Sequence, residues 1–290
     1  MTPLRLAVAA ALAGLLAARA GAAGPVPDAP GPASAAPPAR IVSLAPSVTE
    51  TLFALGVGAR VVAVSDHCDY PPATAALPRV GTFNAPSVEA VLAERPDVVI
   101  GLPSPGNREN VRTMERLGVR VEIVDPERLA DLPGVTRRIA AVAGVPEAGE
   151  RLVAAMQRDM DAVRRKIAGA PAPRTLMLVG QEPLIAVGPE SFLGEMLVAA
   201  GAVNVAPATG AWPRLNLEVV IAADPEVIVD CSMGTEAGTA TRDFWMRFPS
   251  LAAVRNGRIL PFRFLEALRP GPRLALAFEE LARALHPDRF

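Results

Sequence analysis

Short apolar runs rich in β-branched residues alternate with stretches of helical periodicity along most of the chain. In the first half, the apolar runs fall at residues 40–45, 60–65, 97–102 and 120–124, and the helical stretches at 47–55, 87–94 and 107–117. Near-continuous apolar strands that alternate with helices are typical of a parallel sheet covered by helices on both faces. The pattern therefore predicts an N-terminal α/β lobe over residues 40–125.

A second cycle of the same kind follows a proline-rich stretch at residues 171–173. Its apolar runs fall at residues 174–179, 186–187, 226–229 and 258–261, and its helical stretches at 191–200, 217–223, 242–248 and 272–285. The repetition predicts a second α/β lobe, of similar size, over residues 171–290.

Residues 126–170, between the two lobes, contain no strand-like run. Apolar residues from Leu129 to Val163 recur at helical spacing, with basic residues on the other faces. We expect one long helix, or two end to end, with a kink near residues 144–146. The predicted fold is thus two doubly wound α/β lobes joined by a long bridging α-helix, with a ligand cleft between the lobes. A helix that packs on both lobes should allow less hinge closure than flexible crossovers do.

The N-terminal segment has the pattern of an export signal. Arg5 precedes an apolar run at residues 6–18, and small residues follow up to a cleavage pattern at residues 20–22. The alternative, a retained membrane anchor, is disfavoured because the run is too short to span a bilayer. We expect a signal peptide over residues 1–22 and a disordered leader over residues 23–39. No cysteine follows the run, so we expect a periplasmic protein without a lipoprotein anchor.

Charge and cysteine content narrow the class of function. The chain carries 29 basic and 30 acidic residues, a balance that offers no basic surplus to nucleic acid or to an anionic membrane. Cys68 and Cys231 fall in different predicted lobes, which favours two free or buried thiols over a disulfide.

An exported hydrolase is the rival class of function. Ser65, Asp66 and His67 are the residue types of a catalytic triad, but adjacent residues at a strand end point in different directions. The sequence has no G-x-S-x-G elbow, no glycine-rich phosphate loop and no H-E-x-x-H motif. We therefore expect no catalytic residue, no resident cofactor and no metal site.

One helix-to-strand unit occurs twice. In each copy a polar residue, Ser87 or Asn216, precedes an apolar residue and then a glutamate, and a proline follows seven residues after that glutamate. The glutamates are Glu89 and Glu218. A carboxylate in the first turn of a helix is stabilised by the helix dipole, which is a purely structural explanation. Two copies on two similar lobes instead indicate a matched pair of surface carboxylates, suited to a partner with two-fold symmetry and paired arginines.

Several stretches together resemble a known family. They are RIVSLAPSVTETLFALGVGARVVAVSDHCDYPP at residues 40–72, LPRVGTF at 77–83, VGPESFLGEMLVAAGAVNV at 187–205, AWPRLNLE at 211–218 and RPGPR at 269–273. The chain is similar to the class III periplasmic substrate-binding proteins of ABC importers, above all to the vitamin B12-binding ones. The resemblance implies a monomeric periplasmic receptor that delivers cobalamin or a related corrinoid to the transmembrane permease subunits. The class also carries ferric siderophores and haem, which remain the alternatives.

The resemblance also implies roles for particular residues. The docking glutamates of the family match Glu89 and Glu218, which are expected to meet arginines of the two permease subunits. Ligands of doubly wound sheets bind at the carboxyl ends of the strands, and a flat macrocycle needs aromatic faces and a few polar anchors. The residues expected to contact the ligand are Ser47, His67, Tyr70, Phe83, Asn84, Trp212, Pro213 and Arg269.

Departures from the family pattern leave the ligand open. Phe83 lies where the vitamin B12-binding proteins place a tryptophan, His67 replaces a tyrosine, and residues 265–268 replace a more polar loop. His67 can ligate the metal of a bound macrocycle or hydrogen-bond its side groups, or it can simply cap the following turn. Arg269 can hold an anionic group of the ligand, or it can be solvated beside the turn at 270–272. We expect Arg273 to be solvated.

Overall fold

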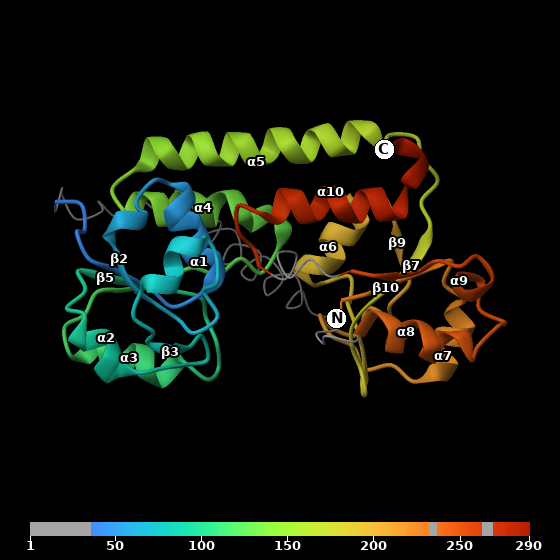
Figure 1. Ribbon diagram of the computed structural model, residues 1–290, viewed down its shortest axis with the longest axis horizontal. Helices are drawn as coiled ribbons and strands as arrows, with labels where there is room; N and C mark the ends of the chain where they lie inside the picture. The colour runs from blue at the N-terminus through green and yellow to red at the C-terminus, as the bar shows by residue number, and fades with distance from the viewer. Residues whose placement is uncertain (1–35, 232–236, 263–268) are drawn as a thin grey trace, which may run out of the picture. The chain divides into compact units, whose positions relative to one another are not determined.

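The computed structural model describes residues 36–231, 237–262 and 269–290 (Figure 1). The expected signal peptide, residues 1–22, and most of the expected leader lie outside this part. Pro38 is buried, and its carbonyl accepts a hydrogen bond from Arg60 Nη1 at 3.0 Å. The amides of Ala39 and Arg40 both donate to Asp97 Oδ2. The last residues of the expected leader therefore pack on the first lobe.

The N-terminal lobe is built on a four-stranded parallel sheet with the order β2-β1-β5-β6. Its strands are β1 (Ile41–Ser43), β2 (Val61–Val64), β5 (Val98–Gly101) and β6 (Val121–Ile123). Successive residues of β1 point to opposite faces, so Ile41 joins one apolar cluster and Val42 another. Helix α1 (Pro46–Ala54) covers one face, and α2 (Val88–Ala93) and α3 (Arg108–Arg116) cover the other. Burial on both faces explains the continuous apolar pattern of the strands.

The C-terminal lobe has a mixed five-stranded sheet. Strands β7 (Arg174–Gln181), β10 (Val227–Asp230) and β11 (Ile259–Pro261) are parallel, β8 (Leu184–Ala186) runs antiparallel to β7, and β9 (Val203–Asn204) also pairs with β7. Helices α6 (Phe192–Ala199) and α10 (Leu274–Leu285) cover one face, while α7 (Leu217–Ala223), α8 (Ala237–Met246) and α9 (Ala252–Arg255) cover the other. The predicted two α/β lobes are confirmed, with the antiparallel β8 as a departure from a purely parallel sheet.

The segment between the lobes forms two helices, α4 (Leu132–Val142) and α5 (Pro146–Lys166). The break falls where the sequence predicts it, but the helices fold back on each other and do not run end to end. Arg137 Nε donates to Glu150 Oε1 at 2.8 Å across the two helices. Gly144 adopts a φ of 73°, a left-handed conformation that ends α4 and lets the chain reverse.

The bridging helix is therefore α5 alone, with 21 residues. Helix α4 belongs to the first lobe, since Ile139 and Ala140 lie in the apolar cluster that contains β1. At its other end α5 packs on the second lobe, where Lys166 Nζ lies 3.0 Å from Glu279 Oε1 of α10. Figure 1 shows α5 extending along both α4 and α10. No helix within the described residues has the length and apolarity needed to cross a membrane.

Short 3₁₀ helices complete the described elements. They lie at Gly58–Arg60, Pro72–Ala76, Leu129–Asp131 and Pro287–Arg289.

Candidate functional site

A hollow of about 590 Å³ lies at the carboxyl ends of β1, β2 and β5. It is lined by Ala45, Pro46, Ser47, Asp66, His67, Asp69, Phe83, Leu102, Arg269 and Pro270. The structure thus brings together Ser47, His67, Phe83 and Arg269 from the predicted ligand-binding set. They meet because parallel strands end at one edge of the sheet, and the loops that follow them share that edge.

The first turn of α1 forms one wall of the hollow. Strand β1 ends at Ser43, and the chain enters α1 through Ala45 and Pro46, which favours the start of a helix because its φ is already helical. Thr49 Oγ1 donates to Ser43 Oγ at 2.7 Å and so ties the helix to the end of the strand. Ser47 is only 4% exposed, and its position faces this hollow.

Two of the lining residues, Arg269 and Asp69, belong to a cluster of four charged groups that also contains Glu50 and Arg273. Arg269 holds Asp69 with both terminal nitrogens, at 2.5 Å from Oδ1 and 3.1 Å from Oδ2, and these hydrogen bonds lower the pKa of Asp69. Its Nη1 also lies 3.3 Å from Oε1 of Glu50, which is almost fully buried on α1. Arg269 is therefore not solvated, and it faces the hollow with its charge matched by carboxylates.

Arg273 corrects one expectation. Its side chain is only 18% exposed, and it binds both carboxylate oxygens of Glu50, so the prediction that it is solvated is wrong. The Arg273 guanidinium also lies 4.0 Å from the centre of the Tyr70 ring, a cation–π contact. The reason is that the turn at 270–272 packs on α1, with Gly271 close to Ser47.

The other predicted ligand-binding residues lie outside the lining of this hollow. Tyr70 is half-exposed and stacks on Arg273, and Asn84 accepts a hydrogen bond from Ser104 Oγ at 2.6 Å. In the second lobe, Trp212 is 52% exposed, and the buried Pro213 accepts a hydrogen bond from the amide of Ala186. Their contact with a ligand stays a prediction.

Sequence reasoning missed Asn107, which positions two parts of the wall. This residue is 2% exposed, and its Nδ2 donates to the carbonyls of Phe83 at 3.1 Å and Leu102 at 3.0 Å. Its Oδ1 accepts from the amide of Ser104. Phe83 sits in the tight hairpin between β3 (Gly81–Thr82) and β4 (Ala85–Pro86). An asparagine at the start of a helical stretch predicts at most a cap for the helix amides, and no signal in the sequence indicates that its side chain holds the carbonyls of other segments.

The thiols are both free and buried, as predicted, and they lie in different apolar clusters. Burial raises the pKa of the Cys68 thiol, which also contacts the hydroxyls of Thr49 and Ser65. Burial raises the pKa of Cys231 to about 12. Among the described residues, no group of three or more His, Cys, Asp and Glu side chains could hold a metal ion.

Glu89 and Glu218 occupy matching places in the two lobes. Each is exposed in the first turn of its helix, α2 or α7, and each helix is capped by the residue before it, Ser87 or Asn216. Both helices end at a left-handed residue, Arg95 with a φ of 45° and Asp224 with a φ of 35°. The repeat seen in the sequence is thus a repeat of local structure.

The match extends to the arginines that begin each lobe. Arg40 Nη2 donates to the carbonyl of Glu94 at 2.6 Å, and Arg174 Nη2 donates to the carbonyl of Ala223 at 2.6 Å. These carbonyls lie at the ends of α2 and α7, five residues beyond each of the two glutamates. In Figure 1 both helices lie well away from α5.

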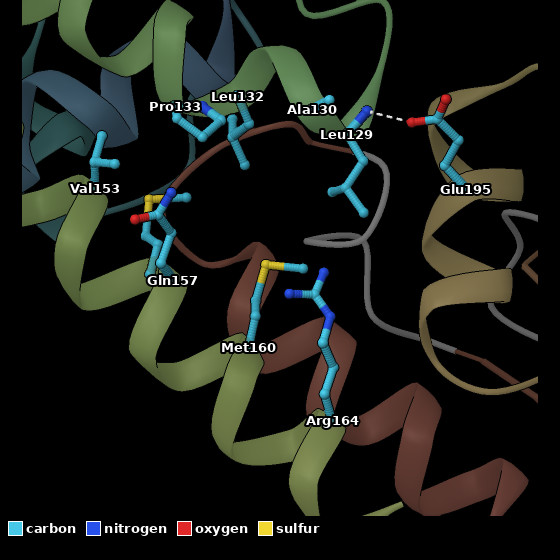
Figure 2. A pocket seen from close by; sticks show the side chains of 10 residues that line it. Leu129, Ala130, Leu132, Pro133, Val153, Gln157, Met160, Arg164 and Glu195 are labelled. Atoms are coloured by element: carbon cyan, nitrogen blue, oxygen red, sulfur yellow. Dashed lines mark hydrogen bonds between the residues drawn. The ribbon is translucent and has the colours of Figure 1, made fainter. Parts of the chain in front are cut away.

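A second hollow, of about 410 Å³, lies beside α5 (Figure 2). Its floor is apolar and includes Leu132, Met156 and Met160. At its rim Glu195 of α6 accepts hydrogen bonds from the Leu129 amide at 2.8 Å, the dashed line in Figure 2, and from Arg128 Nε at 2.7 Å. These bonds fasten the start of the bridging segment to the second lobe. None of the predicted ligand-binding residues lines this hollow.

A family model described as periplasmic binding protein matches residues 41–262. The chain belongs to the periplasmic binding protein family. It is 28% identical over 260 residues to an uncharacterized ABC transporter substrate-binding lipoprotein, YvrC, of Bacillus subtilis, covering 87% of this chain and 82% of that protein. It is 27% identical over 247 residues to the vitamin B12-binding protein of Salmonella choleraesuis, covering 85% and 90% of the two chains.

Solved structures of the family lead to the same architecture. The haem-binding protein RhuT from Roseiflexus sp. RS-1 is similar with a TM-score of 0.75 and 31% identity, over 87% of this chain and 99% of that one. The vitamin B12-binding protein BtuF of Vibrio cholerae is similar with a TM-score of 0.76 and 26% identity, over 86% and 97%. Relatives of the chain are therefore named for two different macrocycles.

Proposed function

We propose that this chain is the solute-binding component of an ABC importer, and that it captures cobalamin or a related corrinoid in the hollow at the strand ends. The observation that carries the proposal is the convergence of Ser47, His67, Phe83 and Arg269 on that hollow. An aromatic face with polar groups around it suits a flat macrocycle that has polar side groups. The curated relatives named as vitamin B12-binding proteins support the same ligand.

Haem is the second candidate ligand, because of two residues in the hollow. His67 is exposed there, and a neutral imidazole is a ligand for haem iron. Arg269 offers a guanidinium, which suits the carboxylates of haem. The likeness to solved haem-binding proteins at 31% and 28% identity supports this alternative.

Delivery to a permease rests on the paired glutamates. Glu89 and Glu218 project from matching helices, so two permease subunits related by two-fold symmetry could each receive one carboxylate. Arginines on the permease would supply charge-assisted, bidentate hydrogen bonds. The receptor acts as a periplasmic monomer in this proposal, exported by the signal expected at residues 1–22.

The ligand is tested by calorimetric titration of residues 23–290 with cyanocobalamin and with haemin. Binding of cyanocobalamin below about 1 μM, a free energy of roughly −8 kcal/mol, supports the corrinoid proposal. Haemin binding alone, with a change in its absorption spectrum that His67→Ala abolishes, supports the haem alternative. If neither macrocycle binds, the proposed ligand is wrong, although membership of the family stands.

Two aromatic variants then locate the site. Phe83→Ala should weaken binding by roughly tenfold, because it removes one stacking face of the hollow. Trp212→Ala is the matched comparison, since Trp212 is exposed in the second lobe and lies outside the hollow. Equal losses would mean that the ligand contacts both lobes. A loss with Trp212→Ala alone would contradict the assignment of the hollow.

A further inference from the structure

The N-terminus of α1 opens into the hollow without a capping side chain. The residue before the helix is Ala45, and Pro46 occupies the first helical position. The amides of Ser47 and Val48 come next, and amides in the first turn have no partner within the helix. These N–H groups, together with the helix dipole, favour an anion at this end. Ala45, Pro46 and Ser47 all line the hollow, so the anion would be part of whatever fills it.

Ser47 adds an independent sign of a bound group. The residue is 4% exposed, and no hydrogen bond of its hydroxyl is found within the described part of the chain. The hydroxyl is not among the fully enclosed polar atoms, so it still reaches the hollow. A hydroxyl at the wall of a hollow, without a partner among the described residues, can donate to an acceptor that enters the hollow. An oxygen of a ligand at the end of α1 would supply that acceptor.

Arg269 is the third component, and it already holds a carboxylate. Asp69 takes both of its terminal nitrogens, yet the Asp69 side chain is 63% exposed and can turn into solvent. Glu50 cannot do so, because it is 2% exposed and both of its oxygens are held by Arg273. If Asp69 turned away, Arg269 would keep two longer contacts, to Glu50 Oε1 at 3.3 Å and to the His67 carbonyl at 3.5 Å. The two terminal nitrogens of Arg269 would then be available to another anion.

We propose that the N-terminus of α1, Ser47 and Arg269 form a subsite for one oxyanion of the transported ligand, and that Asp69 occupies Arg269 until the ligand displaces it. The inference rests on the proposed function, and it adds that the ligand carries a carboxylate or a phosphate. Asp66 is also exposed in the lining, but no ion pair joins it to Arg269 within the described residues. An anion is stabilised only where the Arg269 guanidinium and the N-terminus of α1 can both contact it. Asp69 therefore sets how strongly the site selects for that charge.

The subsite is tested first with inorganic phosphate, through the amide NMR signals of Ser47 and Val48. Phosphate should shift these signals saturably in the wild type. Asp69→Asn removes the competing carboxylate from an exposed ion pair and should tighten phosphate by roughly threefold to tenfold. Arg269→Gln and Ser47→Ala should each weaken it. Because Arg269→Gln also disturbs Glu50, Ser47→Ala decides the case if that variant is poorly folded.

Asp66→Asn is the matched control. It removes the same charge from the same hollow but frees no arginine, so it should change phosphate binding by less than about twofold. Equal tightening by Asp66→Asn and Asp69→Asn would overturn the displacement model, because general electrostatics would explain both. The absence of saturable shifts in both the wild type and Asp69→Asn would overturn the subsite itself.

Macrocycles then distinguish the source of the oxyanion. If Asp69→Asn tightens haemin, the group is a carboxylate. If it tightens cyanocobalamin but not dicyanocobinamide, which lacks the nucleotide loop, the group is a phosphodiester. If Asp69→Asn raises the affinity for none of the macrocycles that the wild type binds, the inference is overturned. If no macrocycle binds the wild type, the proposed ligand fails, while the phosphate titration still decides the subsite.

Discussion

Arg273 holds both carboxylate oxygens of Glu50, with its Nε 2.9 Å from Oε2 and its Nη2 2.7 Å from Oε1. Glu50 lies on α1 in the first lobe, and Arg273 directly precedes α10 in the second. A buried carboxylate loses its hydration, so it is stable in the charged form only when hydrogen bonds and opposite charge compensate. The pair therefore fastens the start of the last helix to the first lobe.

Glu50→Ala should lower the free energy of unfolding by about 3 kcal/mol or more, because the largely buried Arg273 guanidinium loses the carboxylate that accepts from two of its nitrogens. Chemical unfolding followed by circular dichroism measures the change. Glu109→Ala is the control, since the ion pair of Glu109 with Arg116 is two-thirds exposed on α3 and is worth about 0.5 kcal/mol. Similar losses of unfolding free energy in the two variants would show that the buried Glu50 pair stabilises the protein no more than an exposed ion pair does.

The paired glutamates predict a defect in docking that spares the ligand. Glu89→Ala combined with Glu218→Ala should weaken association with the reconstituted permease by roughly tenfold or more, because two charge pairs are lost. Ligand affinity should stay the same, since neither residue lines the hollow. Glu147→Ala with Asp159→Ala removes two exposed acids of α5 as a control. Undiminished uptake by cells that carry the Glu89 and Glu218 changes would refute the docking role.

Asn107 should matter for binding although it lies behind the wall of the hollow. Asn107→Ala leaves the carbonyls of Phe83 and Leu102 without their donor, which should cost about 1–3 kcal/mol of stability and loosen both residues. Ligand affinity should therefore fall along with the unfolding midpoint. Asn204→Ala is the matched control, because the Asn204 side chain also hydrogen-bonds backbone groups, those of Val187 and Ala206, but in the second lobe. If that variant lost as much affinity, global destabilisation would explain both.

The repeat of α/β units was readable from sequence because strands buried on both faces are apolar at nearly every position, as in β1 and β10. The reversal between α4 and α5 was not. Gly144 and Pro146 signal only that a helix ends and another begins, whereas the direction of the second helix depends on tertiary contacts such as Arg137 with Glu150. An end-to-end pair and a folded-back pair have the same periodicity.

In the candidate site, too, some residues could be predicted from the sequence and some contacts could not. Residues at strand ends, such as Ser47 and Phe83, follow from topology, because ligands of these sheets bind at one edge. The ion pairs of Arg269 and Arg273 do not follow from it, since their partners lie 200 or more positions earlier. Asp69 is 200 residues and Glu50 is 219 residues from Arg269, and Glu50 is 223 from Arg273. A pattern in the sequence reports local geometry, and these contacts are made only when α1 and the turn before α10 meet.

The thiols should be unreactive in the folded protein. Burial raises the pKa of both, to about 12 for Cys231, so very little of either is thiolate near pH 8. A colorimetric thiol reagent should therefore react slowly with the native chain and rapidly with both cysteines once guanidinium unfolds it. Rapid reaction in the native state would contradict the burial. The absence of reactive thiols after unfolding without reductant would indicate a disulfide.

Arg95 and Asp224 occupy the same left-handed position at the ends of α2 and α7, but glycine should affect them differently. A non-glycine residue at positive φ is strained, so Arg95→Gly should raise the free energy of unfolding by about 0.5 kcal/mol after the larger entropy of unfolded glycine is subtracted. Asp224→Gly also removes the carboxylate that accepts a hydrogen bond from the Ala252 amide at 2.7 Å, so a net loss of about 1 kcal/mol is expected. Thermal unfolding of both variants measures the difference. Equal shifts of the same sign would mean that backbone strain alone governs the two helix ends.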